Sequence, residues 1–135
     1  MGYLLDTNIC VFFLRGYLDL DVIIKEKGLE NIYISELTVF ELRYGAENSE
    51  NSKKSHKAVD KFINGLSIVP IYGCVDEYAK TKVYLKKNGT PMHDEIDLII
   101  GATALANNFT LITDNLKDFR FIQDLKMENW IKKKN

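Results

Sequence analysis

The sequence predicts an α/β fold in which helices cover both faces of a mainly parallel sheet of four or five strands. Short apolar runs alternate with segments of helical periodicity, the pattern of consecutive βα units. The chain of 135 residues is 46% hydrophobic, which is enough to fill one core. No internal repeat, low-complexity tract or linker divides it. We therefore expect a single domain over residues 1–135.

The first strand of the chain is followed by two helices. The apolar run Tyr3–Asp6 is the predicted strand, and helical periodicity then extends over Asn8–Leu18. A further helix is predicted over about Leu20–Lys27. It stops at Gly28, because glycine readily takes the backbone conformation that ends helices.

The second βα unit begins at the β-branched run Ile32–Ser35. Ser35 then starts a helix that ends near Tyr44-Gly45, since serine is a favoured N-cap residue. Ser49–Lys57 is polar and charged without apolar periodicity, which predicts an exposed connection. It leads into a helix over about Lys57–Gly65.

The second half of the chain repeats the alternation. A third strand is predicted over Ser67–Ile71, followed by a helix over Val75–Lys87 that stops at Asn88-Gly89. The remaining predicted elements are a loop over Thr90–Glu95, a helix over Ile96–Asn107, a strand over Thr110–Thr113 and a short fifth strand near Lys126–Asn129.

Four acidic residues interrupt apolar segments. Asp6 and Asp114 each follow an apolar strand, Glu41 lies on a helix beside apolar and aromatic residues, and Asp97 opens the apolar segment Leu98–Ala102. Burying several carboxylates together is untenable unless cations neutralise them. Hard oxygen ligands suit Mg²⁺ or Mn²⁺, ions that commonly promote phosphoryl chemistry. The pattern predicts a metal-dependent nuclease.

Three of these carboxylates also have a simpler structural explanation. Asp6 and Asp97 each stand where a helix begins and are candidate N-caps, although Thr7 and Asn8 can cap the first helix as well. Asp114 precedes an asparagine, a combination common in turns. Their positions favour a site, because Asp6 and Asp114 both follow strands. Open parallel sheets bind ligands beyond the carboxyl ends of their strands.

Helix geometry supports a role for Glu41. Residues three and four positions away share its face, and these are Leu37, Thr38, Tyr44 and Gly45. A solvated glutamate more often sits among charged residues. We therefore expect the Glu41 carboxylate to face the site.

The overall charge gives no general affinity for nucleic acid. Eighteen Lys and Arg residues oppose nineteen Asp and Glu residues, for a net charge of −1, whereas nucleic-acid-binding proteins tend to be basic. The phosphates of an RNA substrate would have to meet local Lys and Arg groups, the metal ions or basic residues of another chain. Arg43, Arg15 and Lys117 are the candidates for substrate binding within this chain. Asp94 and Asp118 are expected to be solvated.

Cysteine usage and hydropathy indicate the compartment. Cys10 and Cys74 are isolated and show neither zinc-ligand spacing nor a disulfide framework, which predicts two reduced cytosolic thiols. No stretch is suited to span a membrane, and the amino-terminal residues lack the features of a signal peptide. We expect a cytoplasmic protein without a membrane segment. His56 and His93 have no partner at ligand spacing, and neither is a convincing general base.

Four motifs in order resemble a known family. They are Leu5-Asp6-Thr7-Asn8, Glu41-Leu42-Arg43-Tyr44-Gly45-Ala46, Asp97-Leu98-Ile99-Ile100-Gly101-Ala102 and Thr113-Asp114-Asn115. Together they resemble the PIN-domain ribonucleases, and most closely the VapC toxins of bacterial type II toxin–antitoxin pairs. The motifs keep full-domain spacing, so the resemblance covers essentially the whole chain.

The resemblance implies a three-layer α/β/α sandwich and a Mg²⁺- or Mn²⁺-dependent endoribonuclease. Carried over by motif, the catalytic and metal-binding set is Asp6, Glu41, Asp97 and Asp114, with Thr7, Asn8 and Thr113 in support. It further implies an RNA substrate, with the anticodon region of a transfer RNA as one candidate. The implied protein partners are a VapB-type antitoxin that covers the cleft and a second copy of the chain in a homodimer.

The chain departs from the common family pattern at two places. Asp114 stands where many relatives have Asn, and the loop Pro91–Glu95 differs from the Gly-containing version of many relatives. The loop bears on substrate preference rather than on the chemistry. One alternative function is a phospho-receiver domain. Such a domain needs a phospho-accepting Asp at the end of its central strand, whereas the third predicted strand of this chain is followed by Tyr72-Gly73. Another is a catalytically silent PIN-like module, which usually loses part of the acidic set that this chain keeps.

Overall fold

A five-stranded sheet with the strand order β3-β2-β1-β4-β5 forms the centre of the computed structural model, which describes residues 1–131. All four pairings are parallel. The strands are β1 (Tyr3–Leu5), β2 (Ile32–Ser35), β3 (Ser67–Val69), β4 (Thr110–Ile112) and β5 (Met127–Glu128). The helices are α1 (Thr7–Leu14), α2 (Leu18–Lys27), α3 (Glu36–Glu47), α4 (Ser52–Asn64), α5 (Val75–Lys87), α6 (Glu95–Ala106) and α7 (Leu116–Phe119), with short 3-10 helices η1 (Leu29–Asn31) and η2 (Tyr72–Cys74).

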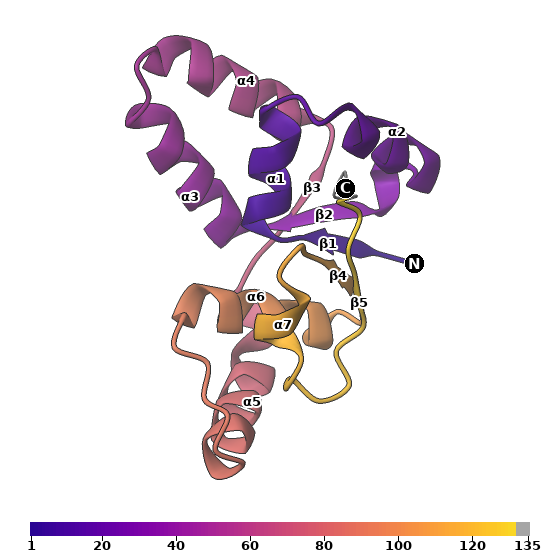
Figure 1. Cartoon of the computed structure of the whole chain (residues 1–135), viewed down its shortest axis with the longest axis vertical. Helices are drawn as coiled ribbons and strands as arrows, with labels where there is room; N and C mark the ends of the chain where they lie inside the picture. Colours follow the sequence, from indigo (N-terminus) through magenta and orange to yellow (C-terminus); the bar gives the residue numbers. More distant parts are fainter. Residues whose placement is uncertain (132–135) are drawn as a thin grey trace.

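Helices cover both faces of the sheet, which confirms the predicted three-layer α/β/α arrangement (Figure 1). Successive strand residues point to opposite faces. Leu5 and Ile34 therefore belong to one buried cluster with residues of α1, α2, α3 and α4. Leu4 and Leu111 belong to a second cluster with residues of α5, α6 and α7. Strands buried on both sides explain why the sequence shows continuous apolar runs there.

The strand order places a topological switch point between β1 and β4. From β1 the chain proceeds to β2 and β3 on one side, then returns to add β4 and β5 on the other side. Leu5 of β1 is level with Ile112 of β4, so the residues after these strands emerge at the same edge. Open α/β sheets bind ligands at such a point. Asp6 and Asp114 are the carboxylates that emerge there.

Some predicted boundaries were wrong. The first helix ends at Leu14 rather than Leu18, because Gly16 adopts a φ of +88° that breaks it, and α2 then begins at Leu18. The segment predicted as an exposed connection up to Lys57 is helical from Ser52 onward. The Asn51 side chain caps this helix by accepting a hydrogen bond from the Lys54 backbone N–H.

Two further differences concern length. Helix α3 continues to Glu47, three residues after the predicted end at Tyr44. Helix α7 was not predicted, since its four residues are too few to show periodicity. In the described part of the chain, none of the helices is both long and apolar enough to cross a bilayer.

Candidate active site

Asp6 is a buried carboxylate that does not cap the helix after it. It occupies the N-cap position of α1, yet its side chain makes no capping hydrogen bond. Its Oδ2 instead accepts a hydrogen bond of 2.9 Å from the Thr113 hydroxyl, and the residue is 3% exposed. Thr113 follows β4, so this bond joins the ends of the two central strands. The simpler explanation as an N-cap therefore does not account for Asp6.

The environment of Asp6 raises its pKa above the usual value for an aspartate. Burial is the main cause, because it penalises the charged form. Hydrogen bonds from Thr113 and from the Thr7 backbone act in the opposite direction, while the negative charges of Asp114 and Glu41 raise the pKa further. Asp6 is thus held close to two other members of the predicted acidic set.

Glu41 is oriented by Thr7 across the interface of α1 and α3. The Thr7 hydroxyl donates a hydrogen bond of 2.6 Å to Glu41 Oε1 and lies 3.0 Å from the Thr38 hydroxyl. Thr38 is fully buried on the same helix face as Glu41. Thr7, which follows β1, therefore holds the carboxylate of Glu41 on α3, the helix that follows β2.

Asp97 lies in the first turn of α6 without capping it. Helix α6 begins at Glu95, and the Asp94 carboxylate caps it by accepting a hydrogen bond of 3.1 Å from the Asp97 backbone N–H. The half-buried Asp97 side chain is therefore free to face the site. Its pKa is raised to about 7, first by burial and then by the charges of Asp6, Asp94, Glu41 and Asp118.

Asp114 carries a buried oxygen that needs a partner. Its Oδ1 is buried and has no hydrogen-bond partner among the described residues. A buried oxygen without a partner is costly, and native structures usually satisfy such atoms. Asp114 follows β4 next to Asp6, whose pKa it raises. The unsatisfied oxygen is what a site for a cation would show.

The acidic residues fit a divalent cation, although they are not drawn tightly together. Within residues 1–131, no three acidic, histidine or cysteine side chains converge closely enough to enclose an ion. The set offers only carboxylate oxygens, the donors that Mg²⁺ and Mn²⁺ prefer. Burial is the main cause of the raised pKa values of Asp6 and Asp97, and the negative charges of neighbouring carboxylates raise them further. A bound cation would remove this repulsion.

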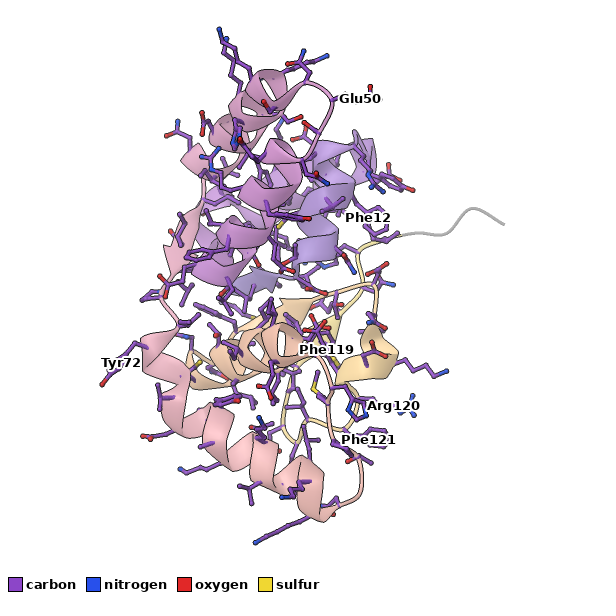
Figure 2. The ribbon with its side chains drawn as sticks, turned by 90° about the vertical axis from the view of Figure 1, so that its left-hand side faces the viewer. Phe12, Glu50, Tyr72, Phe119, Arg120 and Phe121 are labelled. Atoms are coloured by element: carbon purple, nitrogen blue, oxygen red, sulfur yellow. The ribbon has the colours of Figure 1, made fainter. Side chains whose placement is uncertain are left out.

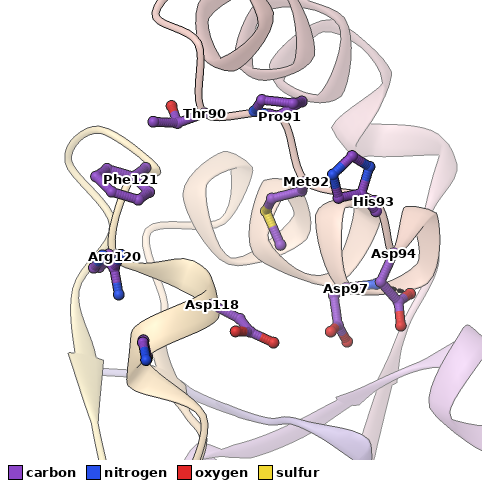
Figure 3. A pocket seen from close by; sticks show the side chains of 10 residues that line it. Thr90, Pro91, Met92, His93, Asp94, Asp97, Asp118, Arg120 and Phe121 are labelled. Atoms are coloured by element: carbon purple, nitrogen blue, oxygen red, sulfur yellow. Dashed lines mark hydrogen bonds between the residues drawn. The ribbon is translucent and has the colours of Figure 1, made fainter.

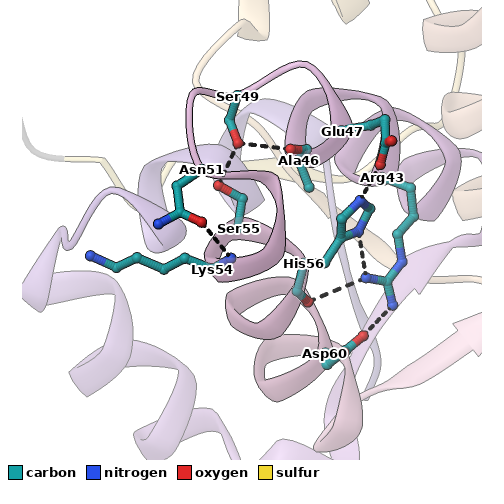
Figure 4. A network of polar contacts seen from close by, with 9 residues as sticks. All are labelled: Arg43, Ala46, Glu47, Ser49, Asn51, Lys54, Ser55, His56 and Asp60. Carbon is teal, nitrogen blue, oxygen red and sulfur yellow. Dashed lines mark hydrogen bonds and ion pairs between the residues drawn. The ribbon is translucent and has the colours of Figure 1, made fainter.

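The basic residues predicted to bind substrate lie in three different surroundings. Arg43 forms an ion pair with Asp60 and hydrogen bonds with His56, so its guanidinium links α3 to α4 (Figure 4). Arg15 is exposed and lines a groove that also contains Glu41. Lys117 lines a pocket that also contains Asp97. Arg43 is therefore the least available of the three for a phosphate.

Two expectations for polar residues need refinement. Asp94 and Asp118 are exposed, as expected, yet both line the pocket beside Asp97 and raise its pKa. The capping role of Asp94 was missed, although aspartate directly before a helical segment is a favoured N-cap residue. Asn8, predicted to support the site, is exposed on the second residue of α1.

Comparisons with known proteins identify the family of the chain. Residues 3–123 match the PIN domain family. The chain is 33% identical to "Ribonuclease VapC2" of Rickettsia felis, over 98% of this chain and 100% of the relative. It is 27% identical to a "tRNA(fMet)-specific endonuclease VapC" of Salmonella typhimurium, over 96% and 98% of the two chains. The crystal structure of VapBC2 from Rickettsia felis bound to a promoter DNA fragment contains a chain that matches with a TM-score of 0.88, at 32% identity and 97% and 100% coverage.

Proposed function

The chain belongs to the VapC group of the PIN domain family, and we propose that it is a Mg²⁺- or Mn²⁺-dependent endoribonuclease acting as the toxin of a toxin–antitoxin pair. The observation that carries the metal dependence is the unsatisfied, buried Oδ1 of Asp114 beside the buried carboxylate of Asp6. Ribonuclease activity is supported by the full-length similarity to named VapC ribonucleases.

The carboxylates have different proposed roles. Asp6 and Asp97 would hold the first ion together with Glu41, because both are buried or half-buried and free of capping duties. Asp114 would bind a second ion or the attacking water through its unsatisfied Oδ1. Thr113 and Thr7 keep the carboxylates of Asp6 and Glu41 in place through their hydroxyl groups.

The proposed reaction is hydrolysis of a phosphodiester. A divalent cation supplies water activation near neutral pH and neutralises charge that develops on the phosphate. Water adds to phosphorus and the bond to the 3′ oxygen breaks, which leaves a 5′ phosphate and a 3′ hydroxyl. No histidine is required as a base. His56 is occupied by Glu47 and Arg43 at the far end of α3.

The substrate is RNA, and transfer RNA is the class that the relatives favour. The relative from Salmonella typhimurium is named for cleavage of tRNA(fMet). We extend this to a transfer RNA anticodon region, whose unpaired bases are accessible to side chains.

Sequencing of RNA 5′ ends after brief induction in cells tests the function. We expect new 5′ phosphate ends at a small number of sites within transfer RNA, and none after induction of the Asp6→Asn variant. Purified protein should then produce the same ends in the presence of Mn²⁺. If the protein is toxic but no new RNA ends arise, a silent binding module becomes the better explanation.

A cognate VapB-type antitoxin is the proposed protein partner. Solved structures similar to this chain include VapBC complexes. Beside Glu41, a groove of about 400 Å³ between α1, α3 and α4 offers an apolar surface next to the acidic residues. Its apolar lining consists of Val11, Leu14, Leu42, Ala46, Ala58 and Val59. An antitoxin segment could place apolar side chains in the groove and one Lys or Arg at the acidic residues.

A homodimer in the cytoplasm is the proposed assembly. Phe40 and Tyr44 on α3 are 71% and 72% exposed, and Tyr72 is 85% exposed and points away from the chain (Figure 2). The Ile71 backbone N–H donates to the Glu36 carboxylate, which places Tyr72 near the start of α3. Exposed aromatic side chains of this kind are suited to burial against a second copy. Cys10 and Cys74 are buried free thiols, in keeping with a reducing compartment.

A further inference from the structure

A second pocket adjoins the acidic site at Asp97 and does not include Glu41. It has a volume of about 380 Å³ and lies between the loop before α6 and the segment around α7. Figure 3 shows Pro91, Met92 and His93 along one side, Arg120 and Phe121 along the other, and Asp97 beside Asp118. Asp97 lines this pocket and interacts with the charge of Asp6. Asp97 therefore borders both the acidic site and the pocket.

Phe121 presents an exposed aromatic ring at this pocket. The ring is 45% exposed, whereas Phe119, two residues earlier, is fully buried in the core. The Arg120 guanidinium lies over the Phe121 ring at 4.5 Å from its centre. Such an arginine–aromatic pair forms a flat platform, and unpaired nucleobases stack on both aromatic rings and guanidinium planes.

The cations of this pocket are not committed to neighbouring carboxylates. Among the described residues, neither Lys117 nor Arg120 forms an ion pair, in contrast to Arg43, which is bound by Asp60. Both residues are exposed. The pocket is also lined by Asp94, Asp97 and Asp118, so contact with an anionic ligand that carries an aromatic group falls to Lys117 and Arg120 beside the exposed ring.

We propose that this pocket binds one unpaired nucleotide of the RNA next to the phosphate that is cleaved, with its base stacked on Phe121 and its phosphates contacted by Lys117 and Arg120. The inference rests on the proposed function and names how the substrate is held. The volume suits a single small ligand unit rather than a duplex. Stacking does not depend on base identity, so the contact positions the strand.

A binding titration tests the pocket independently of cleavage. Short unstructured RNAs carry the fluorescent base 2-aminopurine at one position at a time, and the protein is titrated into each without added divalent ions. We expect quenching at one position for the wild-type chain and for Tyr84→Ala, an exposed aromatic of α5 outside the pocket. Phe121→Ala should lose the quenching, and Phe121→Trp should retain it. If the wild-type chain quenches no position, the inference is wrong.

The salt dependence of affinity separates the cations from the ring. Lys117→Gln and Arg120→Gln should each lower the slope of log Kd against log salt by about 0.7, the value for one phosphate contact on a single strand. Phe121→Ala should weaken binding and leave the slope unchanged. Lys86→Gln on α5 is the control, because Lys86 is an exposed lysine outside the pocket. If log Kd depends on log salt with the same slope in Lys117→Gln, Arg120→Gln and Lys86→Gln, the proposed phosphate contacts of Lys117 and Arg120 are wrong.

Cleavage of RNAs with single abasic sites locates the base in the reaction. With Mn²⁺ present, removing the base that occupies the pocket should lower kcat/KM of the wild-type chain roughly tenfold. The same abasic site should not lower kcat/KM of Phe121→Ala any further, because the loss of the base and the loss of the ring remove the same stacking contact. Additive losses at every position would overturn the inference while leaving the nuclease function intact.

The remaining outcomes also decide between the proposals. If the wild-type chain cleaves no RNA, the proposed function fails, and the 2-aminopurine titration still decides whether the pocket binds a nucleotide. If Phe121→Ala leaves RNA binding and cleavage unchanged but weakens binding of the antitoxin, the pocket is a protein contact and the nucleotide inference is wrong.

Discussion

The Thr113 hydroxyl donates a buried hydrogen bond of 2.9 Å to the Asp6 carboxylate, across 107 positions of sequence. The bond joins the residue after β1 to the residue after β4, at the point where the strand order reverses. It lowers the pKa of Asp6 against the stronger effect of burial. Thr113 therefore helps to keep Asp6 ionised and directed at the site.

Thr113→Val should weaken the metal site without unfolding the protein. Loss of the hydroxyl removes the bond to Asp6 and the bond that the hydroxyl accepts from the Asn115 N–H. We expect the affinity for Mn²⁺, measured by calorimetry, to fall by roughly 10- to 100-fold, as for other residues that orient metal ligands. Thr113→Ser should restore it.

The matched control is Thr103→Val. The Thr103 hydroxyl is also buried, but it donates to the Ile99 carbonyl within α6, so this change leaves the acidic residues alone. Both variants should lose on the order of 1 kcal/mol in free energy of unfolding. Equal Mn²⁺ affinity in the two variants would show that Thr113 is only structural.

Asp94 and Asp97 should respond in opposite ways to neutralisation, because one caps a helix and the other is a ligand. Asp97→Asn should abolish RNA cleavage and leave the metal-free protein as stable or more stable, since repulsion from Asp6, Asp94 and Glu41 is relieved. Asp94→Ala removes the cap of α6 and should cost roughly 0.5–2 kcal/mol. Thermal unfolding without metal distinguishes them, and a large loss for Asp97→Asn would favour a structural role.

The fold and the placement of Asp6 and Asp114 at one edge of the sheet were predictable from sequence because both depend on strong local patterns. Apolar runs buried on both faces identify β1 and β4, and an acidic residue after each run places a site at the carboxyl ends. Helix α4 was partly missed because its first half buries little, so its start depends on the Asn51 cap. The pairing of Arg43 with Asp60 depends on how α3 packs on α4, which no local pattern encodes.

Divalent metal should support both activity and stability. Cleavage of RNA should require Mg²⁺ or Mn²⁺ and stop on addition of excess EDTA, since the proposed activation of water depends on a cation held by the carboxylates. Mn²⁺ at about one hundred times its Kd should raise the free energy of unfolding by about 2.7 kcal/mol, because it binds only the folded chain. Calorimetric unfolding with and without Mn²⁺ measures this gain. Cleavage that persists in EDTA would refute the metal mechanism.

The stability of the metal-free protein should carry a pH dependence due to Asp97. Its pKa of about 7 lies above the ordinary value of 3.8, so folding takes up a proton between these values. The stability contributed by this proton is full below the unfolded pKa and is lost as the pH rises through about 7.

The comparison with Asp97→Asn isolates this effect from other titrating groups. Between about pH 5 and about pH 8, the wild-type chain should lose more stability than the variant. Mn²⁺ should remove the difference at high pH, where the ionised carboxylate binds the ion. Identical pH profiles for the two metal-free proteins would contradict the raised pKa.

The antitoxin should compete with divalent metal for the acidic residues. We expect it to place an Arg or Lys among Asp6, Glu41 and Asp97, with apolar side chains in the groove between α1, α3 and α4. The cation would replace the charge of the metal, and the apolar contacts would supply most of the affinity.

A titration of antitoxin binding against Mn²⁺ measures the competition. Saturating Mn²⁺ should weaken antitoxin binding to the wild-type chain, because both ligands need the same carboxylates. The double variant Asp6→Asn/Asp97→Asn should bind the antitoxin more weakly and with little response to Mn²⁺. Leu14→Ala in the groove is the complementary variant, which should weaken the antitoxin and leave Mn²⁺ binding unchanged. If the antitoxin binds the wild-type chain and the double variant equally tightly with Mn²⁺ saturating, it inhibits the toxin at another surface.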